Sequence, residues 1–85
     1  MYGQTMIDKD LDTPVYVQLA DLLRAQIEDG SLAPRRPLPS IRTLTQTYDV
    51  ADGTVKKAVA VLRAEGLVRT VTGRGVFVVD RAADA

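Results

Sequence analysis

The sequence contains no cysteine and no histidine, and these two absences exclude several kinds of chemistry. Without cysteine the chain forms no disulfide and offers no thiol nucleophile. Without histidine it cannot build a catalytic triad that uses an imidazole base. Zinc prefers cysteine and histidine ligands, so a zinc site is not expected. Because no phosphate-binding loop or other nucleophile–base pair is visible either, we expect neither an enzyme nor a bound cofactor or metal.

Long apolar runs are also missing. No stretch approaches the roughly 20 residues that a membrane-spanning helix requires. Residues 1–12 are polar and acidic, unlike the basic start and apolar centre of a signal peptide. These features predict a cytoplasmic protein without membrane contact. The length of 85 residues is suited to one small domain.

The chain also lacks a net charge, because 11 basic side chains balance 11 acidic ones. A neutral chain at first argues against nucleic-acid binding. The charges are, however, unevenly distributed. Residues 1–30 carry six acidic and two basic side chains, whereas residues 31–79 carry eight basic and three acidic ones. A folded domain could therefore present a basic face to phosphate and an acidic face elsewhere.

The first third of the chain predicts an arm and one helix. Residues 1–12 are expected to form a mobile arm. Thr13 and Pro14 suit the N-cap and first position of a helix, and Gly30 suits its left-handed end. Between them, residues 14–29 show apolar side chains at helical spacing, namely Val15, Leu19, Leu22, Leu23 and Ile27.

The middle of the chain predicts two further helices joined by a tight turn. Residues 31–39 contain three prolines and cannot be helical throughout. Ser40 is expected to cap a short helix that carries Ile41, Leu44 and Tyr48 on one face. Asp49 and Val50 form the turn, since Asp tolerates left-handed backbone angles. The third helix begins with Asp52 as its cap, ends at Gly66 and buries one apolar face, made by Val55, Ala58, Val59 and Leu62.

The last third predicts a β-hairpin, with strands at residues 67–72 and 76–79 around the turn Thr72-Gly73-Arg74-Gly75. Arg63 and Arg69 are expected to be solvated or paired, with Glu65 as a possible partner, and residues 80–85 to form a frayed tail. The fold class is therefore mainly α with a small β-hairpin (α+β). The architecture is a winged helix-turn-helix of three helices plus a wing, with residues 13–79 as the domain.

This order of elements indicates DNA binding. In a helix-turn-helix the second of the two helices enters the major groove, which is wide enough to admit it. The glycine-rich tip of the hairpin can approach a phosphate or the minor groove closely. Arg74 lies between two glycines there, and an arginine is attracted to a narrow groove of negative potential.

The residues that carry these features resemble the N-terminal DNA-binding domain of GntR-family regulators. The resemblance extends from Pro14 to Val79 and is carried by PVYVQLADLLRAQIEDGSL, LPSIRTLTQTYDV, TVKKAVAVLRAEGLV and GRGVFV, in that order. It implies a winged helix that binds a palindromic operator as a dimer. The effector-binding domain that usually follows in the family is not present in these 85 residues, and no effector pocket is visible.

The resemblance also implies which residues contact DNA. The family's Pro-Ser-x-Arg motif is kept at residues 39–42, and the recognition helix begins at residues 51–56. The candidate DNA-binding residues are Ser40, Arg42, Gly53, Thr54, Lys56, Lys57, Thr72, Gly73, Arg74 and Gly75. For Lys57, a phosphate contact and a merely solvating role remain equally open.

The sequence departs from the family pattern at some of these positions and beside them. At the start of the recognition helix, Ala51 replaces the usual Ser, and Lys56 replaces an Arg, which preserves the charge but not the bidentate fork. Ile41 replaces a residue that is often Glu, and Arg35 and Pro37 replace the usual Gly and a basic residue.

Asp52 replaces an arginine that the family directs at DNA. A carboxylate there repels phosphate, although it could accept a hydrogen bond from cytosine N4. We expect Asp52 to be a helix cap rather than a base reader.

Two hypotheses of different classes follow. The first is a sequence-specific regulator, by analogy a repressor, that dimerises at least on DNA because one domain makes few phosphate contacts. The second is a winged-helix module that binds proteins and has weak or no affinity for DNA, which Asp52 and the neutral charge support. Salt dependence separates them, since phosphate contacts weaken steeply with salt and apolar contacts do not.

Overall fold

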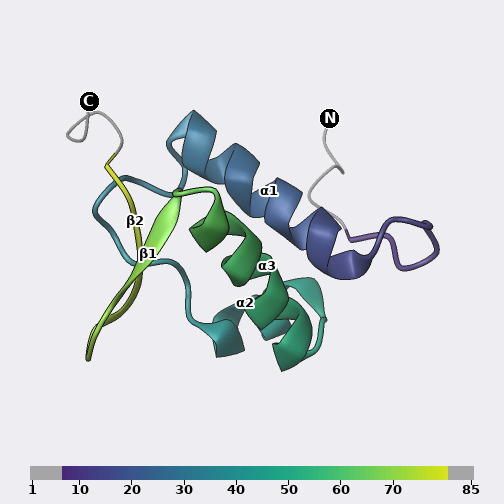
Figure 1. Cartoon of the computed structure of the whole chain (residues 1–85). Helices are drawn as coiled ribbons and strands as arrows, with labels where there is room; N and C mark the ends of the chain where they lie inside the picture. The colour runs from purple at the N-terminus through teal and green to yellow at the C-terminus, as the bar shows by residue number, and fades with distance from the viewer. Residues whose placement is uncertain (1–6, 81–85) are drawn as a thin grey trace.

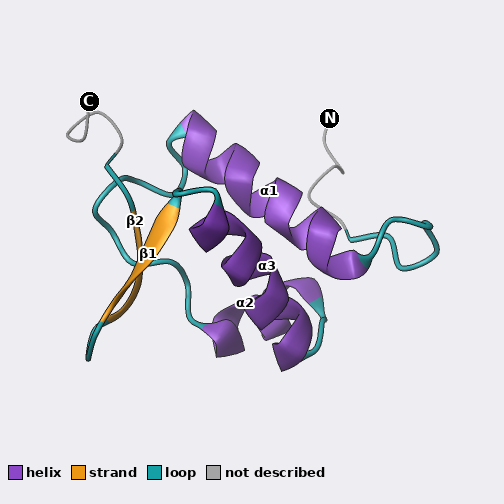
Figure 2. Cartoon of the chain, in the orientation of Figure 1, coloured by secondary structure: helices purple, strands orange, loops and turns teal. Residues whose placement is uncertain are grey.

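A computed structural model describes residues 7–80 and contains three helices followed by a hairpin (Figure 1). The helices are α1 (Val15–Asp29), α2 (Ile41–Tyr48) and α3 (Asp52–Ala64). The strands β1 (Val68–Val71) and β2 (Gly75–Val78) pair in antiparallel fashion. The predicted winged helix-turn-helix is therefore confirmed, and Figure 2 shows the helices grouped on one side of the hairpin.

The core lies where α1 crosses α3 and where the base of the hairpin closes against them. Its fully buried side chains come from α1, α3 and β1, as the helical and alternating patterns predict. The four predicted inward residues of α3 are all buried. The complete set of buried side chains is Leu19, Ala20, Leu23, Leu38, Leu44, Val55, Ala58, Val59, Leu62, Leu67, Val68 and Val78.

The prediction is correct for the C-terminal end of α1 and wrong for its N-terminal cap. Gly30 has the expected left-handed backbone, with φ of 88°. Thr13, however, is not the cap, because Pro14 occupies the N-cap position and no side chain caps this end. The side-chain Nε2 of Gln18 instead donates to the Thr13 carbonyl at 2.9 Å. A proline without an N–H fits this place, since the first helical amides lack partners in any case.

Helix α2 begins and ends at the predicted residues, and Leu44 is its buried residue. The Ser40 hydroxyl accepts a hydrogen bond from the Thr43 amide at 3.1 Å, which makes Ser40 the N-cap. Asp49 ends the helix with the expected left-handed φ of 55°. On the predicted face of this helix Leu44 is buried and Tyr48 is partly buried, whereas Ile41 is 37% exposed.

Helix α3 begins one residue earlier than predicted. Ala51 is the N-cap, and Asp52 is already the first helical residue, with no side-chain hydrogen bond to the backbone. The predicted capping role of Asp52 is therefore wrong. Its carboxylate still lies beside the positive end of the helix dipole, where a negative charge is favourable. Gly66 follows the helix with a φ of 78°, as a terminating glycine should.

The hairpin is shorter than predicted, and it has a neighbour that the sequence did not reveal. Val71 pairs with Gly75, so the loop comprises Thr72, Gly73 and Arg74, and Gly75 belongs to β2. The proline-rich segment 35–38 runs along the other edge of β2, with Leu38 N–H donating to the Val76 carbonyl at 2.8 Å. This pairing anchors the start of α2 to the wing.

An ion-pair cluster joins α1 to the end of α3. The Arg24 guanidinium donates to both carboxylate oxygens of Glu65, at 2.8 and 2.7 Å, and to Asp21 at 2.6 Å. Glu65 therefore pairs with Arg24 and not with either of the arginines considered from the sequence. The hydrogen bonds that Arg24 donates hold the pKa of Glu65 below its ordinary value. Donating to the carboxylates of Glu65 and Asp21 raises the pKa of Arg24.

The predicted division into an arm (residues 1–12), a domain (13–79) and a tail (80–85) remains a prediction. Residues 1–6 and 81–85 lie outside the described part. Within it, the end of the expected arm contacts the domain: Lys9 Nζ donates to the Asp49 carbonyl at 2.7 Å. The Asp8 amide donates to Gln18 at 2.9 Å. None of the helices among residues 7–80 has the length and apolar character needed to cross a bilayer.

Candidate nucleic-acid interface

Three segments from different parts of the chain meet at one edge of the molecule. In Figure 1 the first turn of α2, the first turn of α3 and the tip of the hairpin all lie at the lower edge, while α1 runs along the upper side. The short left-handed turn at Asp49 sets the direction of α3 relative to α2. The pairing of segment 35–38 with β2 sets the position of the hairpin relative to α2. The fold therefore brings the three segments that carry the predicted DNA-binding residues to one edge of the molecule.

In the α2 segment, the hydroxyl of Ser40 forms hydrogen bonds within the protein, whereas the guanidinium of Arg42 forms none with the described residues. Ser40 Oγ accepts from the Thr43 amide and donates to Thr43 Oγ1 at 3.0 Å, so its hydrogen bonds are made within the helix cap. Arg42 is exposed, and its guanidinium has no hydrogen bond or ion pair with any other described residue. Arg42 can therefore reach an external anion, whereas Ser40 fixes the helix start.

The α3 segment exposes most of the predicted residues. Gly53, Lys56 and Lys57 are exposed and Thr54 is partly buried. A Cβ atom built on Gly53 meets no atom within 4 Å, so the fold leaves open space in front of this residue. Lys57 Nζ lies 4.7 Å from the centre of the Tyr16 ring on α1. This cation–π contact is a third role for Lys57, and the sequence pattern did not indicate it.

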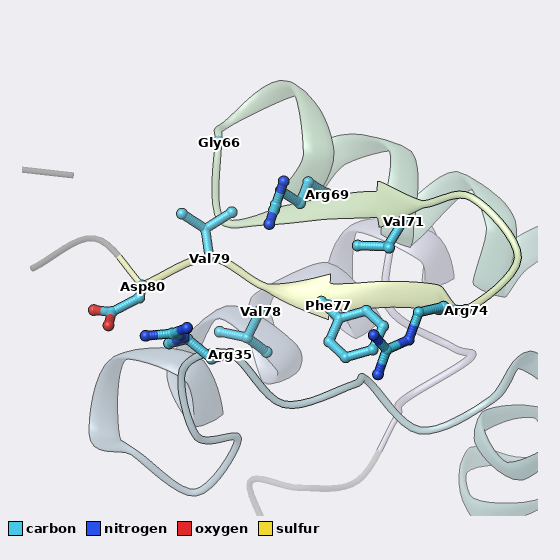
Figure 3. Close-up of a pocket in the computed structure, with 9 residues that line it drawn as sticks. All are labelled: Arg35, Gly66, Arg69, Val71, Arg74, Phe77, Val78, Val79 and Asp80. Atoms are coloured by element: carbon cyan, nitrogen blue, oxygen red, sulfur yellow. The ribbon is translucent and has the colours of Figure 1, made fainter. Parts of the chain in front are cut away.

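The wing tip exposes Thr72, Gly73 and Arg74 together. Gly73 adopts a φ of 79° and Gly75 a φ of 116°, conformations that L side chains rarely adopt. Both glycines are thus required by the turn itself, whatever else they do. The Arg74 guanidinium lies over the ring of Phe77 on β2, 5.6 Å from its centre (Figure 3). This contact limits the freedom of the arginine at the tip.

A groove of about 470 Å³ lies between α2, α3 and the wing. We call it the recognition groove. Its lining combines apolar residues with three basic ones, Lys56 and Arg63 from α3 and Arg74 from the wing. Arg63 was not among the predicted residues, although it follows Lys56 by seven positions and therefore shares its helix face. The lining residues are Pro37, Leu38, Pro39, Ser40, Ile41, Leu44, Lys56, Val59, Arg63, Arg74, Gly75 and Val76.

A second basic surface lies on the opposite face of the hairpin. Figure 3 shows Arg35, Arg69 and Arg74 around a half-buried floor that includes Val71 and Phe77. Arg69 and Phe77 are directly opposed across the two strands. Arg35 has a left-handed φ of 67°, at a position where the family resemblance expects glycine. The arginine therefore adds charge at the expense of backbone strain.

Among the described residues no acidic side chain lines the recognition groove, although Asp52 is exposed in the first turn of α3. Six acidic side chains belong to the arm and α1, and all six are exposed: Asp8, Asp10, Asp12, Asp21, Glu28 and Asp29. The folded domain is consequently polarised, with an acidic side along α1 and a basic edge at the groove. Among residues 7–80 no group of three or more acidic side chains is arranged to hold a metal ion.

The fold and this basic edge define a winged helix-turn-helix domain. Residues 15–78 match the family model for "Bacterial regulatory proteins, gntR family". Because the match covers most of the chain, the protein belongs to the GntR family, and these residues form a GntR-type DNA-binding domain. The family and the relatives below are transcription regulators rather than enzymes.

Among curated proteins, the chain is similar to two repressors of Bacillus subtilis. It is 39% identical over 72 residues to the HTH-type transcriptional repressor NagR, covering 85% of this chain and 30% of NagR. It is 33% identical over 76 residues to the HTH-type transcriptional repressor YtrA, covering 89% of this chain and 58% of YtrA. The chain thus spans well under two thirds of these relatives.

Among solved structures, the fold is similar to that of YtrA from Sulfolobus acidocaldarius, a GntR-family transcription factor. The TM-score is 0.80 at 33% identity, with 95% of this chain and 98% of that chain covered. It is also similar to the DNA-binding domain of AraR in complex with operator ORX1. There the TM-score is 0.77 at 29% identity, with 86% of this chain and 92% of that chain covered.

Proposed function

We propose that this chain binds a specific sequence of double-stranded DNA through the recognition groove and the first turn of α3, and that it represses transcription by occupying an operator. The observation that carries the proposal is the convergence of α2, α3 and the wing on one basic edge. The AraR domain, which has the same fold, has been crystallised with operator DNA. The names of NagR and the Bacillus YtrA support repression as the outcome.

Each part of the edge has a distinct role in this proposal. The first turn of α3 enters the major groove, where Thr54 and Lys56 contact base edges. Gly53 lets the helix backbone approach the bases, because no protein atom fills the space before it. Arg42 and Lys57 contact phosphate, and Ser40 holds α2 in place for Arg42. The wing tip, formed by Thr72, Gly73, Arg74 and Gly75, contacts the backbone or minor groove.

We further propose that the protein binds a palindromic operator as a homodimer. One domain with only a few phosphate contacts binds weakly at physiological salt, and two linked domains multiply the affinity. A two-fold symmetric dimer would require two half-sites whose spacing reports its geometry. Since the DNA of a bacterium lies in the cytoplasm, we place the protein there. Light scattering that shows one monomer per duplex would contradict the dimer.

The experiment selects bound duplexes from a random-sequence pool, sequences them and measures the affinity of the enriched site at several salt concentrations. We expect a palindromic motif and an affinity that falls steeply with salt. Arg42→Ala and Lys56→Ala should each weaken binding by roughly five- to hundredfold, which corresponds to about 1–3 kcal/mol for a good contact. Arg69→Ala is the matched control, because Arg69 is exposed on the opposite face of the hairpin.

The alternative function, a protein-interaction module, has one specific observation in its favour. Asp52 is exposed in the first turn of α3, where a negative charge repels phosphate. If no duplex is enriched even at low salt, the regulator proposal fails and the alternative stands. Asp52→Arg adds a direct test, because it should strengthen DNA binding only if position 52 faces the duplex.

A further inference from the structure

Ile41 is a large apolar side chain that the fold leaves exposed at the proposed DNA-binding edge. It is 37% exposed, and within residues 7–80 the only other large apolar side chain classed as exposed is Leu11, at 53%. Leu11 lies in the arm, whereas Ile41 is the first residue of α2, between the cap Ser40 and the free cation Arg42. A single exposed apolar residue needs no explanation in general. Its position here does, because among residues 7–80 no other large apolar side chain at this edge is exposed, and its neighbours Ser40 and Arg42 are polar and charged.

The surroundings of Ile41 place it against whatever fills the recognition groove. Ile41 lines the groove together with Lys56 from α3 and Arg74 from the wing. In the proposed function Lys56 reads base edges and Arg42, the residue after Ile41, contacts phosphate. A side chain that lines the same groove as Lys56 and directly precedes Arg42 would then lie close to the wall of the major groove. Binding DNA would therefore remove the exposed part of Ile41 from water.

We propose that Ile41 contacts the 5-methyl group of a thymine and thereby makes the protein prefer thymine at one position of each half-site. This inference rests on the proposed function. The thymine methyl is the apolar feature of the major groove, where the other base edges present hydrogen-bond donors and acceptors. An isoleucine that covered a donor or acceptor would leave it without a partner, which is costly. The methyl group is thus the base feature that matches Ile41.

A deoxyribose of the backbone is the other apolar surface that Ile41 could cover. Every nucleotide carries this sugar, so such a contact would add affinity without a base preference. The two cases differ in one measurable respect. Replacing thymine by uracil removes the 5-methyl group and leaves both the sugar and the base pairing unchanged.

The test uses the duplex enriched from the random pool and replaces its thymines by uracil one at a time. Binding is measured with the wild-type protein, with Ile41→Ala and with Leu11→Ala as the matched exposed apolar control. At one position per half-site, uracil should weaken wild-type binding by about fourfold, the effect of burying one methyl-sized group. Leu11→Ala should show the same loss, and Ile41→Ala should show none.

Further readouts make each outcome decisive. Equal unfolding temperatures of wild type and Ile41→Ala would show that the variant folds, as expected for an exposed site. Repeating the selection with Ile41→Ala should abolish the preference for thymine at that position. If uracil has no effect, or the same effect on both proteins, the inference about Ile41 is overturned while the proposed function stands. If the wild type binds no duplex at all, both are overturned.

Discussion

Replacing Gly53 by alanine should raise the stability of the fold and lower its affinity for DNA, and these opposite changes test the placement of α3. Gly53 is the second residue of α3 and does not have a positive φ. An added Cβ meets no protein atom within 4 Å. Alanine in a helix is favoured over glycine by roughly 0.5–1 kcal/mol, because the unfolded chain loses less entropy on folding. No steric cost opposes this gain within the described residues.

Thermal unfolding followed by circular dichroism measures the first effect. For a domain of this size about 1 kcal/mol corresponds to a shift of roughly 4–8 °C in Tm, so an increase of about 2–8 °C is expected. Gly66→Ala is the matched control. It adds the same methyl group, also into open space, but at a φ of 78° where alanine is strained. Its Tm should therefore fall.

Binding to the enriched duplex measures the second effect. If the backbone at Gly53 lies against the bases, the added methyl group should reduce the affinity by tenfold or more. A loss of affinity in a more stable protein cannot be ascribed to unfolding. Unchanged affinity in a stabilised Gly53→Ala protein would refute the placement of the first turn of α3 in the major groove. A lower Tm would refute the description of this helix start.

Three further changes test other parts of the structure. Ser40→Ala removes the cap of α2 and should cost about 1 kcal/mol in chemical denaturation, whereas Ser40→Gly should cost a few tenths. Arg35→Gly relieves a left-handed φ of 67° and should stabilise the domain by up to about 1 kcal/mol, and Arg36→Gly should not. Because Arg24 lowers the pKa of Glu65 in the folded state, Glu65 contributes stability above its ordinary pKa of 4.5 and loses it as the pH falls through the lower folded value. The Tm difference between wild type and Glu65→Gln should therefore be constant above about pH 5.5 and shrink at lower pH; a difference that grows on acidification would contradict the ion pair.

The charge distribution shows why net charge is a poor guide to nucleic-acid binding in a small domain. The neutral total conceals an acidic arm and α1 and a basic edge at the recognition groove. Attraction to phosphate depends on the local field, which falls off within a Debye length of about 8–10 Å. We expect the acidic side to matter little for a duplex bound at the groove, and Asp52 to be the acidic residue whose charge the duplex meets.

The sequence alone determined the fold class and most local features, because those depend on short-range physics. Helical spacing identifies the buried faces of α1 and α3, and Gly30, Ser40 and Asp49 mark helix ends through their own backbone or side-chain chemistry. The motifs at residues 39–42 and 73–75 identified the family. These signals lie within a few residues of each other and need no knowledge of distant contacts.

Only the tertiary structure decided which side chains meet across the fold. The partners of Glu65 and Lys57 lie 41 residues away on α1, and the neighbour of β2 is a proline-rich segment that carries no strand signal. Likewise, Ile41 is exposed although its helical spacing places it on the same face as the buried Leu44. Such contacts depend on the packing angle and length of whole elements, which no local pattern encodes, and they assemble the recognition groove from three separate segments.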